Sequence, residues 1–302
     1  MKVGITGASG FLGSAIIEEG KRRGWTIVAF SRRVDRPVSG ADEMRSLADP
    51  GAIDLNDLNA IIHLAGEPIA ALWTKDRKRR IHESRVDLTR DLVESIAAVS
   101  RTRRPSVLVS ASAIGIYGDR GDDWLDEESD VGFGYLAGVC RDWEGASAPT
   151  GKLGVRLVNP RIGLVLGREG FLKRLRMIFK LGLGGRLGRG NQWMSWIHLR
   201  DLARLFADCV ENEKIQGRVN CVAPNPATNR EFTTCYARVL RRKAIFPVPA
   251  FLLKRLPWGM GHLFLDSQRV DPVVMKSFGF QWEFPDLESA LADVEKVVNW
   301  KL

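Results

Sequence analysis

The stretch Thr6-Gly7-Ala8-Ser9-Gly10-Phe11-Leu12-Gly13 stands between a short apolar run and a segment with apolar residues at helical spacing. The run 3–5 is short enough for a buried strand, and the segment 14–24 ends on a glycine that stops a helix. A strand, a glycine-rich turn and a helix in this order are the context in which three spaced glycines carry meaning. The sequence therefore predicts that the chain opens with one strand-turn-helix unit.

Each glycine of this turn has its own physical task. Gly7 permits a tight turn, Gly10 lets a phosphate approach the backbone, and Gly13 lets the helix pack closely on the strand. The first N–H groups of the helix have no partner within it and favour an anion. The spacing is Gly-x-x-Gly-x-x-Gly, so an ordinary glycine-rich turn is the alternative interpretation. The residues that we predict to contact a dinucleotide are Gly7, Ser9, Gly10, Phe11 and Leu12.

The next apolar run, 26–30, ends in Ser31-Arg32-Arg33. In a dinucleotide-binding fold, the residue at this strand's end meets the adenosine ribose, and an acidic side chain there binds the 2′-hydroxyl of NAD. This chain has a hydroxyl and guanidinium groups instead, which suit a 2′-phosphate through charge-assisted hydrogen bonds. We therefore predict NADP as the cofactor, with Ser31 and Arg32 as contacts. A solvated loop position is the alternative, for Arg33 in particular.

Further apolar runs alternate with helical segments along the chain. Buried strands are predicted at 60–64, 106–110, 155–163 and 219–222, and a helix with an apolar stripe at 73–96. The alternation predicts an α/β fold with a doubly wound parallel sheet of the Rossmann type. Ligands of such sheets bind at the carboxyl ends of the strands. The cofactor contacts that we predict there are Leu64, Ala65, Gly66, Ser110 and Ile162.

Three segments together resemble an extended short-chain dehydrogenase/reductase: 6–13, 63–66 and 110–118. More narrowly, the chain resembles the atypical "epimerase family protein" branch, whose members are often labelled nucleoside-diphosphate-sugar epimerases or SulA-like proteins. The segments Cys140-Arg141-Asp142-Trp143-Glu144 and Trp196-Ile197-His198 support this narrower resemblance. The resemblance covers nearly the whole chain. It implies a bound NADP(H), with Arg85 as a further contact, and no securely known substrate.

The resemblance also implies a catalytic Ser, Tyr and Lys, of which the chain keeps only part. The Tyr exchanges a proton with the reacting oxygen, the Ser polarises that oxygen, and the Lys lowers the Tyr pKa from about 10 toward neutrality. We align Ser112 with the serine, with Ser110 as the alternative, and Tyr135 with the tyrosine. The lysine position holds Val139. A partly buried aromatic without a catalytic role is therefore an equally good interpretation of Tyr135.

The composition of the sequence changes after residue 225, where prolines separate short amphipathic segments that we predict to be helices. We predict a dinucleotide-binding domain over 1–225 and a small C-terminal domain on the substrate side over 226–302. A glycine-rich, basic excursion at 167–193 is expected to reach toward that side. It either closes over an acidic substrate, such as a nucleotide sugar, or forms a surface loop without a ligand.

Composition limits the other possibilities. The net charge of +9 comes from scattered Lys and Arg clusters without interleaved aromatic residues, so solvated helix faces are favoured over a nucleic-acid surface. The four cysteines and four histidines show no metal-ligand spacing, and we predict no metal site. No apolar run is long enough to span a membrane, and the first predicted strand begins at residue 2, so we expect a cytoplasmic protein.

Two functional hypotheses follow. The first is an NADP(H)-dependent oxidoreductase or nucleoside-diphosphate-sugar epimerase with an unidentified carbonyl or sugar-nucleotide substrate, which Ser112 and Tyr135 favour. The second is a regulatory binding protein, linked to cell division by the SulA-like label, in which NADP(H) tunes conformation without turnover. Val139 favours this second hypothesis. The sequence defines neither the substrate nor the oligomeric state, and whether the chain is an enzyme stays open.

Overall fold

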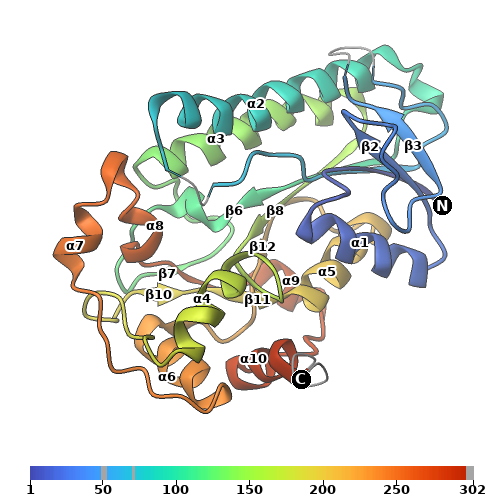
Figure 1. The fold of residues 1–302 in the computed structure, drawn as a ribbon. Helices are drawn as coiled ribbons and strands as arrows, with labels where there is room; N and C mark the ends of the chain where they lie inside the picture. Colours follow the sequence, from blue (N-terminus) through green and yellow to red (C-terminus); the bar gives the residue numbers. More distant parts are fainter. Residues whose placement is uncertain (49–52, 70–71, 297–302) are drawn as a thin grey trace.

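A parallel sheet forms the centre of the computed structural model, which describes residues 1–48, 53–69 and 72–296 (Figure 1). Its main path has the order β12-β8-β5-β4-β1-β2-β3, and every neighbouring pair is parallel. The strand order reverses between β1 and β4, which makes this the doubly wound sheet that the sequence predicts. The strands are β1 (Lys2–Thr6), β2 (Thr26–Ser31), β3 (Glu43–Ser46), β4 (Ala60–His63), β5 (Val107–Ser110), β8 (Arg156–Ile162) and β12 (Gly217–Cys221), with β6 (Ser112–Ala113) paired to β8.

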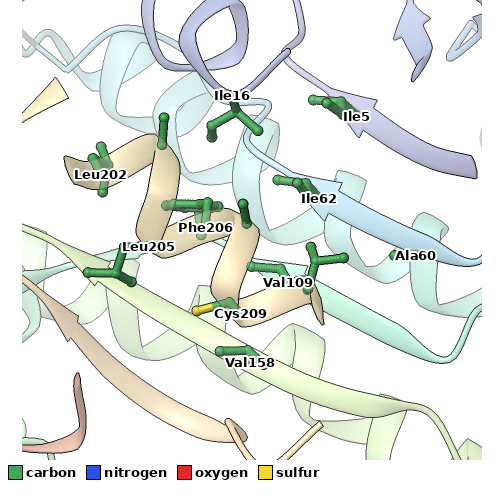
Figure 2. Close-up of a cluster of buried hydrophobic side chains, with 14 of the residues drawn as sticks. Ile5, Ile16, Ala60, Ile62, Val109, Val158, Leu202, Leu205, Phe206 and Cys209 are labelled. Carbon is green, nitrogen blue, oxygen red and sulfur yellow. The ribbon is translucent and has the colours of Figure 1, made fainter. Parts of the chain in front are cut away.

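Helices cover both faces of this sheet (Figure 1). On one face, α1 (Phe11–Arg22) packs beside α5 (Leu199–Glu211), and Figure 2 shows Phe206 of α5 against the strands that carry Ile62 and Val109. On the other face, α2 (Lys75–Ala98) packs beside α3 (Tyr135–Ser147). Neighbouring residues of one strand serve opposite faces because side chains alternate along a strand. Ile62 belongs to the α1–α5 core, whereas Ile61 belongs to the core beneath α2.

A second core lies where the excursion meets the C-terminal part of the chain. Leu172 and Phe179 of α4 (Gly170–Lys180) pack with Phe232 and Tyr236 of α6 (Asn229–Val239) and with Leu291 of α10 (Leu287–Lys296). The division at residue 225 stays a prediction, because residues before and after it share this core. The remaining elements are β7 (Trp124–Leu125), β9 (Leu164–Leu166), β10 (Trp193–Met194), β11 (Trp196–His198), β13 (Ala227–Thr228), α7 (Ala250–Lys254), α8 (His262–Leu265), β14 (Arg269–Val270) and α9 (Val273–Ser277).

The excursion is more ordered than a loop. Its residues 170–180 form helix α4, because Leu172, Leu175 and Phe179 recur at helical spacing and place their side chains on one side. After α4, the antiparallel pair β10–β13 and the parallel pair β11–β9 tie the excursion to its surroundings. Within the described residues, no helix has both the length and the apolarity needed to cross a bilayer.

A chain of hydrogen bonds joins β1, β4 and α2 at the carboxyl edge of the sheet. Thr6 Oγ1 lies 2.7 Å from His63 Nδ1, and His63 Nε2 lies 3.0 Å from Thr89 Oγ1. Thr89 donates its proton to the carbonyl of Arg85 at 2.5 Å. Thr6 Oγ1 also accepts the backbone N–H of Leu64 and Ala65. These partners assign the imidazole proton to Nε2, since Thr89 must accept there and Thr6 must donate to Nδ1.

Two helix glycines provide a matched test of close packing. A Cβ at Gly13 would lie 2.6 Å from the carbonyl oxygen of Ala8, whereas a Cβ at Gly145 would meet no atom within 4 Å. Gly13→Ala should therefore lower the free energy of unfolding by about 1–3 kcal/mol through overpacking. Gly145→Ala should raise it by about 0.5–1 kcal/mol, because alanine favours the helix. Urea unfolding of both variants measures the difference, and equal effects would contradict the close approach of α1 to the turn.

His63 gives a pH-dependent stability. Complete burial lowers its pKa to about 4, with a smaller contribution from the Arg85 charge. Below about pH 6.5 the His63 side chain binds a proton in the unfolded chain but stays neutral in the folded chain. The free energy of unfolding should therefore fall between about pH 6.5 and 4, by up to about 3 kcal/mol. His63→Gln should remove the part of this dependence that His63 causes in urea titrations, and the part from His198, whose pKa burial also lowers to about 4, should remain. The control His262→Gln changes an exposed side chain that pairs with Asp266 and should change the slope less than His63→Gln does. Equal slopes for wild type and His63→Gln would refute the assignment.

Candidate functional site

The glycine turn after β1 is pressed against the chain that follows β4. Gly7 has a φ of +69°, and a Cβ there would lie 3.0 Å from Leu64 C and Ala65 N. Gly10 precedes α1 without a side-chain cap, and no acidic residue lies in the first turn. Ser9 and Gly10 are exposed. The open N–H groups at the start of α1 therefore face solvent at the carboxyl edge of the sheet, where an anion would be stabilised.

Arg85 lies directly beneath the second loop of this edge. A Cβ at Gly66 would be 2.9 Å from the guanidinium carbon of Arg85, so a larger residue there would displace the Arg85 side chain. Arg85 is 8% exposed and donates to the carbonyl oxygens of Glu67 and Ile81, at 3.0 and 3.1 Å. Burial lowers its pKa. Among the described residues no carboxylate pairs with it, so a buried positive charge lacks an anionic partner, which is a costly arrangement.

The residues predicted to select the cofactor lie at the next strand end. Ser31 closes β2, and its Oγ accepts the N–H of Arg33 at 3.1 Å. Arg32 is exposed, and we find no ion pair for it within the described part of the chain. Because β2 is the parallel neighbour of β1, this strand end and the glycine turn share one edge of the sheet. Their contacts with a nucleotide stay predictions.

The two candidate serines differ in their partners. Ser110 ends β5 beside His63, is fully buried, and has a hydroxyl with no partner among the described residues. Ser112 is 2% exposed and donates to Glu144 Oε1 at 2.7 Å. The hydroxyl proton of Ser112 is therefore already used in a hydrogen bond. Only the lone pairs of the Ser112 oxygen can interact with another group. A buried hydroxyl without a hydrogen-bond partner is rare in proteins. Of the two serines, Ser110 is therefore the one whose hydroxyl can still donate a hydrogen bond to a ligand.

A buried ion pair holds the carboxylate that binds Ser112. Arg161, 1% exposed, donates to both oxygens of Glu144, at 2.9 and 3.0 Å. A third N–H of Arg161 donates to Tyr117 Oη at 2.9 Å. Glu144 was part of the family resemblance in the sequence, but its pairing with Arg161 was not predicted. An arginine within an apolar strand was the available signal, because such a charge must find a partner inside the protein.

Tyr135 and Val139 lie on the side of α3 that faces α2. The hydroxyl of Tyr135 donates to the carbonyl of Lys78 at 2.9 Å, and its ring contacts Trp73 with centroids 5.2 Å apart. Val139 is 4% exposed and packs with Trp73 and Ile81. Among the described residues no hydrogen bond joins Tyr135 to Ser112. The structure thus does not bring the two candidates together, and the catalytic role of Tyr135 stays a prediction.

The remaining predicted contacts surround the same edge. Phe11 begins α1 and packs on the excursion, since a Cβ at Gly167 would lie 2.5 Å from its ring. Leu12 packs against the α1–α5 core, and Ile162 ends β8 beside Cys221 of β12. Within residues 1–48, 53–69 and 72–296, no group of three or more His, Cys, Asp or Glu is arranged to hold a metal ion.

Known proteins share this architecture over nearly the full length of the chain. The human epimerase family protein SDR39U1 (isoform 2), solved with NADPH, is 29% identical, with a TM-score of 0.89 over 98% of this chain and 99% of that chain. A nucleoside-diphosphate sugar epimerase from Corynebacterium glutamicum is 33% identical, with a TM-score of 0.78 over 97% of this chain and 57% of that chain. The chloroplastic SDR39U1 homolog of Arabidopsis thaliana is 36% identical over 96% of this chain and 86% of its own length.

Two family profiles divide the chain between them. A domain of unknown function, DUF1731, matches residues 248–294 and so covers most of the predicted C-terminal unit. Residues 3–221 match the NAD dependent epimerase/dehydratase family, a range that includes the glycine turn, Ser112 and Tyr135. These matches confirm the resemblance seen in the sequence. The chain belongs to the NAD dependent epimerase/dehydratase family.

Proposed function

We propose that this protein is an NADP(H)-dependent oxidoreductase or epimerase whose substrate is a carbonyl compound or a sugar nucleotide. The observation that carries the proposal is the edge formed by the glycine turn and the buried Arg85. The human relative solved with NADPH supports NADP(H) as the cofactor, as the sequence predicts. The family and its named relatives do not favour the regulatory alternative without turnover. A cytoplasmic location stays a prediction, and one relative is described as chloroplastic.

The residues at this edge suit a dinucleotide. The crowded glycines leave backbone N–H groups accessible at the start of α1, and Arg85 holds a positive charge that no carboxylate of the described residues pairs with. A pyrophosphate would supply the missing negative charge. Ser31 and Arg32 would hold the adenosine end, as their hydroxyl and exposed guanidinium suit a 2′-phosphate. Ser110 keeps a buried hydroxyl proton for a group at the nicotinamide end.

The bound nicotinamide would supply hydride transfer, and the protein's own residues would handle protons. Glu144 accepts a hydrogen bond from the Ser112 hydroxyl. The Ser112 oxygen is therefore oriented to accept a hydrogen bond from a substrate hydroxyl. Arg161 keeps the Glu144 carboxylate in place by donating to both of its oxygens. Tyr135 is the proposed proton donor. Burial raises its pKa, which outweighs the opposing effect of the Arg85 charge and keeps the phenol protonated at neutral pH.

An acidic substrate would fit the charge of the excursion. The excursion at 167–193 contains seven Lys or Arg and a single acidic residue, Glu169. The excursion contacts the start of α1 through Phe11, so it borders the proposed cofactor edge. A phosphate-bearing substrate, such as a sugar nucleotide, would be attracted there by charge.

Cofactor selection tests the first part of the proposal. NADPH should bind more tightly than NADH by roughly one to two decades, because a charge-assisted contact with the 2′-phosphate contributes about 1.5–3 kcal/mol. Arg32→Ala should remove most of this difference by weakening NADPH alone, as followed by calorimetric titration. The control Arg36→Ala changes another exposed arginine of the same loop and should keep the preference. Equal affinity of the wild type for both nucleotides would rule the assignment out.

The direction of turnover tests the role of Tyr135. A protonated phenol donates readily but accepts poorly, so reduction of a carbonyl should proceed at pH 7 while oxidation of an alcohol rises only toward pH 10 and above. Absorbance of NADPH, followed with a panel of carbonyl compounds and sugar nucleotides, measures both directions. Tyr135→Phe should reduce turnover at least about a hundredfold.

Tyr236→Phe is the matched control for this experiment. Tyr236 is equally a tyrosine with a bonded hydroxyl, but it lies in the core between α6 and α10 and donates to Glu295 at 3.0 Å. Its removal should leave turnover unchanged. Brisk oxidation at pH 7 that persists in Tyr135→Phe would show that another group exchanges the proton.

A further inference from the structure

Half of the large apolar side chains that the described part of the chain exposes gather on two segments. Sixteen such residues are exposed, and eight of them lie within 177–183 and 245–252, at 46–65% exposure. The two segments belong to α4 with the turn after it, and to the chain leading into α7. We call their surface the apolar-basic face. Its apolar members are Met177, Ile178, Leu181, Leu183, Ile245, Phe246, Phe251 and Leu252.

The backbone joins these segments side by side. The N–H of Phe246 donates to the carbonyl of Gly184, and the N–H of Val248 donates to the carbonyl of Arg186, at 3.2 and 2.9 Å. Gly188 donates back to the carbonyl of Val248 at 2.8 Å. The two segments that carry the face are therefore hydrogen-bonded to each other over residues 184–188 and 246–248. The face lies on the half of the molecule that holds α4, α6 and α7, away from the N-terminus (Figure 1).

The core does not need these apolar side chains. Leu172 and Phe179 already supply the buried side of α4 and pack with α6. Met177, Ile178 and Leu181 lie on the other side of the helix, where solvent-facing positions are ordinarily polar. A contiguous apolar patch that is exposed in a folded protein commonly marks a binding surface.

The two segments that carry the patch are basic, although Lys173, Arg176 and Arg200 pair with carboxylates outside these segments. Residues 170–200 and 241–265 together contain twelve Lys or Arg, seven in the first and five in the second, and no Asp or Glu. Lys180, Lys243 and Lys254 are all exposed. The ligand of this face must therefore offer an apolar layer bordered by negative charge.

We propose that the apolar-basic face binds the surface of an anionic lipid bilayer. In that position the Leu, Ile, Phe and Met side chains enter the boundary between headgroups and acyl chains, while Lys and Arg contact lipid phosphates and carboxylates. A second copy of this chain fits less well, because a two-fold interface would place the same basic residues against one another. The net charge of +9 adds long-range attraction to the bilayer.

Flotation with vesicles tests the proposal on the full chain. The protein should float with vesicles of phosphatidylcholine mixed with phosphatidylserine and stay unbound with phosphatidylcholine alone. Raising NaCl from about 0.05 M to 0.5 M should release it, because salt screens the charge term. Leu181→Ser/Ile245→Ser should weaken binding at least about tenfold by removing two apolar side chains that are mostly exposed. Lys180→Glu/Lys243→Glu should do the same through charge.

Arg101→Glu/Lys152→Glu is the matched control. It changes the net charge equally, at two exposed positions outside the apolar-basic face, and should keep most of the binding. Circular dichroism and melting temperature confirm that each variant folds. Three results would overturn the proposal: no flotation of the wild type with anionic vesicles, equal losses in the control and in Lys180→Glu/Lys243→Glu, or a dimer that Leu181→Ser/Ile245→Ser dissociates while vesicles bind neither protein.

Discussion

The close approach of two backbone turns determines the rest of the cofactor edge. Thr6 Oγ1 accepts the N–H groups of Leu64 and Ala65, which draws the chain after β4 against the turn after β1. Only a glycine at position 7 tolerates that distance, and it does so with a positive φ. His63 secures the arrangement from inside, because it binds both Thr6 and Thr89. A neutral, buried imidazole thus fixes the relative positions of β1, β4 and α2.

Two buried arginines beyond this edge are compensated in different ways. Arg161 has a carboxylate, Glu144, that takes both ends of its guanidinium fork. Among the described residues, Arg85 instead contacts two carbonyl oxygens and the face of Trp143, 5.1 Å away. The ion pair between Arg161 and Glu144 is complete within the protein and has a structural role. It fixes the carboxylate to which Ser112 donates its hydrogen bond. A buried cation without an anion stays available to a ligand, and this contrast is the strongest physical argument for an anion site beside Gly66.

The sequence predicted the fold well because the strands alternate with helices and end on small residues. The turn at 6–13, the buried strands and the doubly wound topology all followed from local patterns. Contacts between distant segments did not. Glu144 and Arg161 meet only because α3 returns beside β8, and residues 170–180 become α4 only because α6 and α10 cover their apolar side. Glycine content suggested a loop there, and tertiary packing overrode it.

The position of Val139 explains how the site differs from one with a lysine. Tyr135, Val139 and Trp143 follow one another at four-residue spacing along α3 and so share one face. That face meets α2, where Arg85 already places a positive charge over Trp143 and lowers the pKa of Tyr135 against the larger effect of burial. A lysine at 139 would add a second buried cation to this apolar cluster, so valine is compatible with Arg85. The Arg85 guanidinium, however, keeps its proton at neutral pH. It can adjust the acidity of the phenol but cannot relay a proton from it.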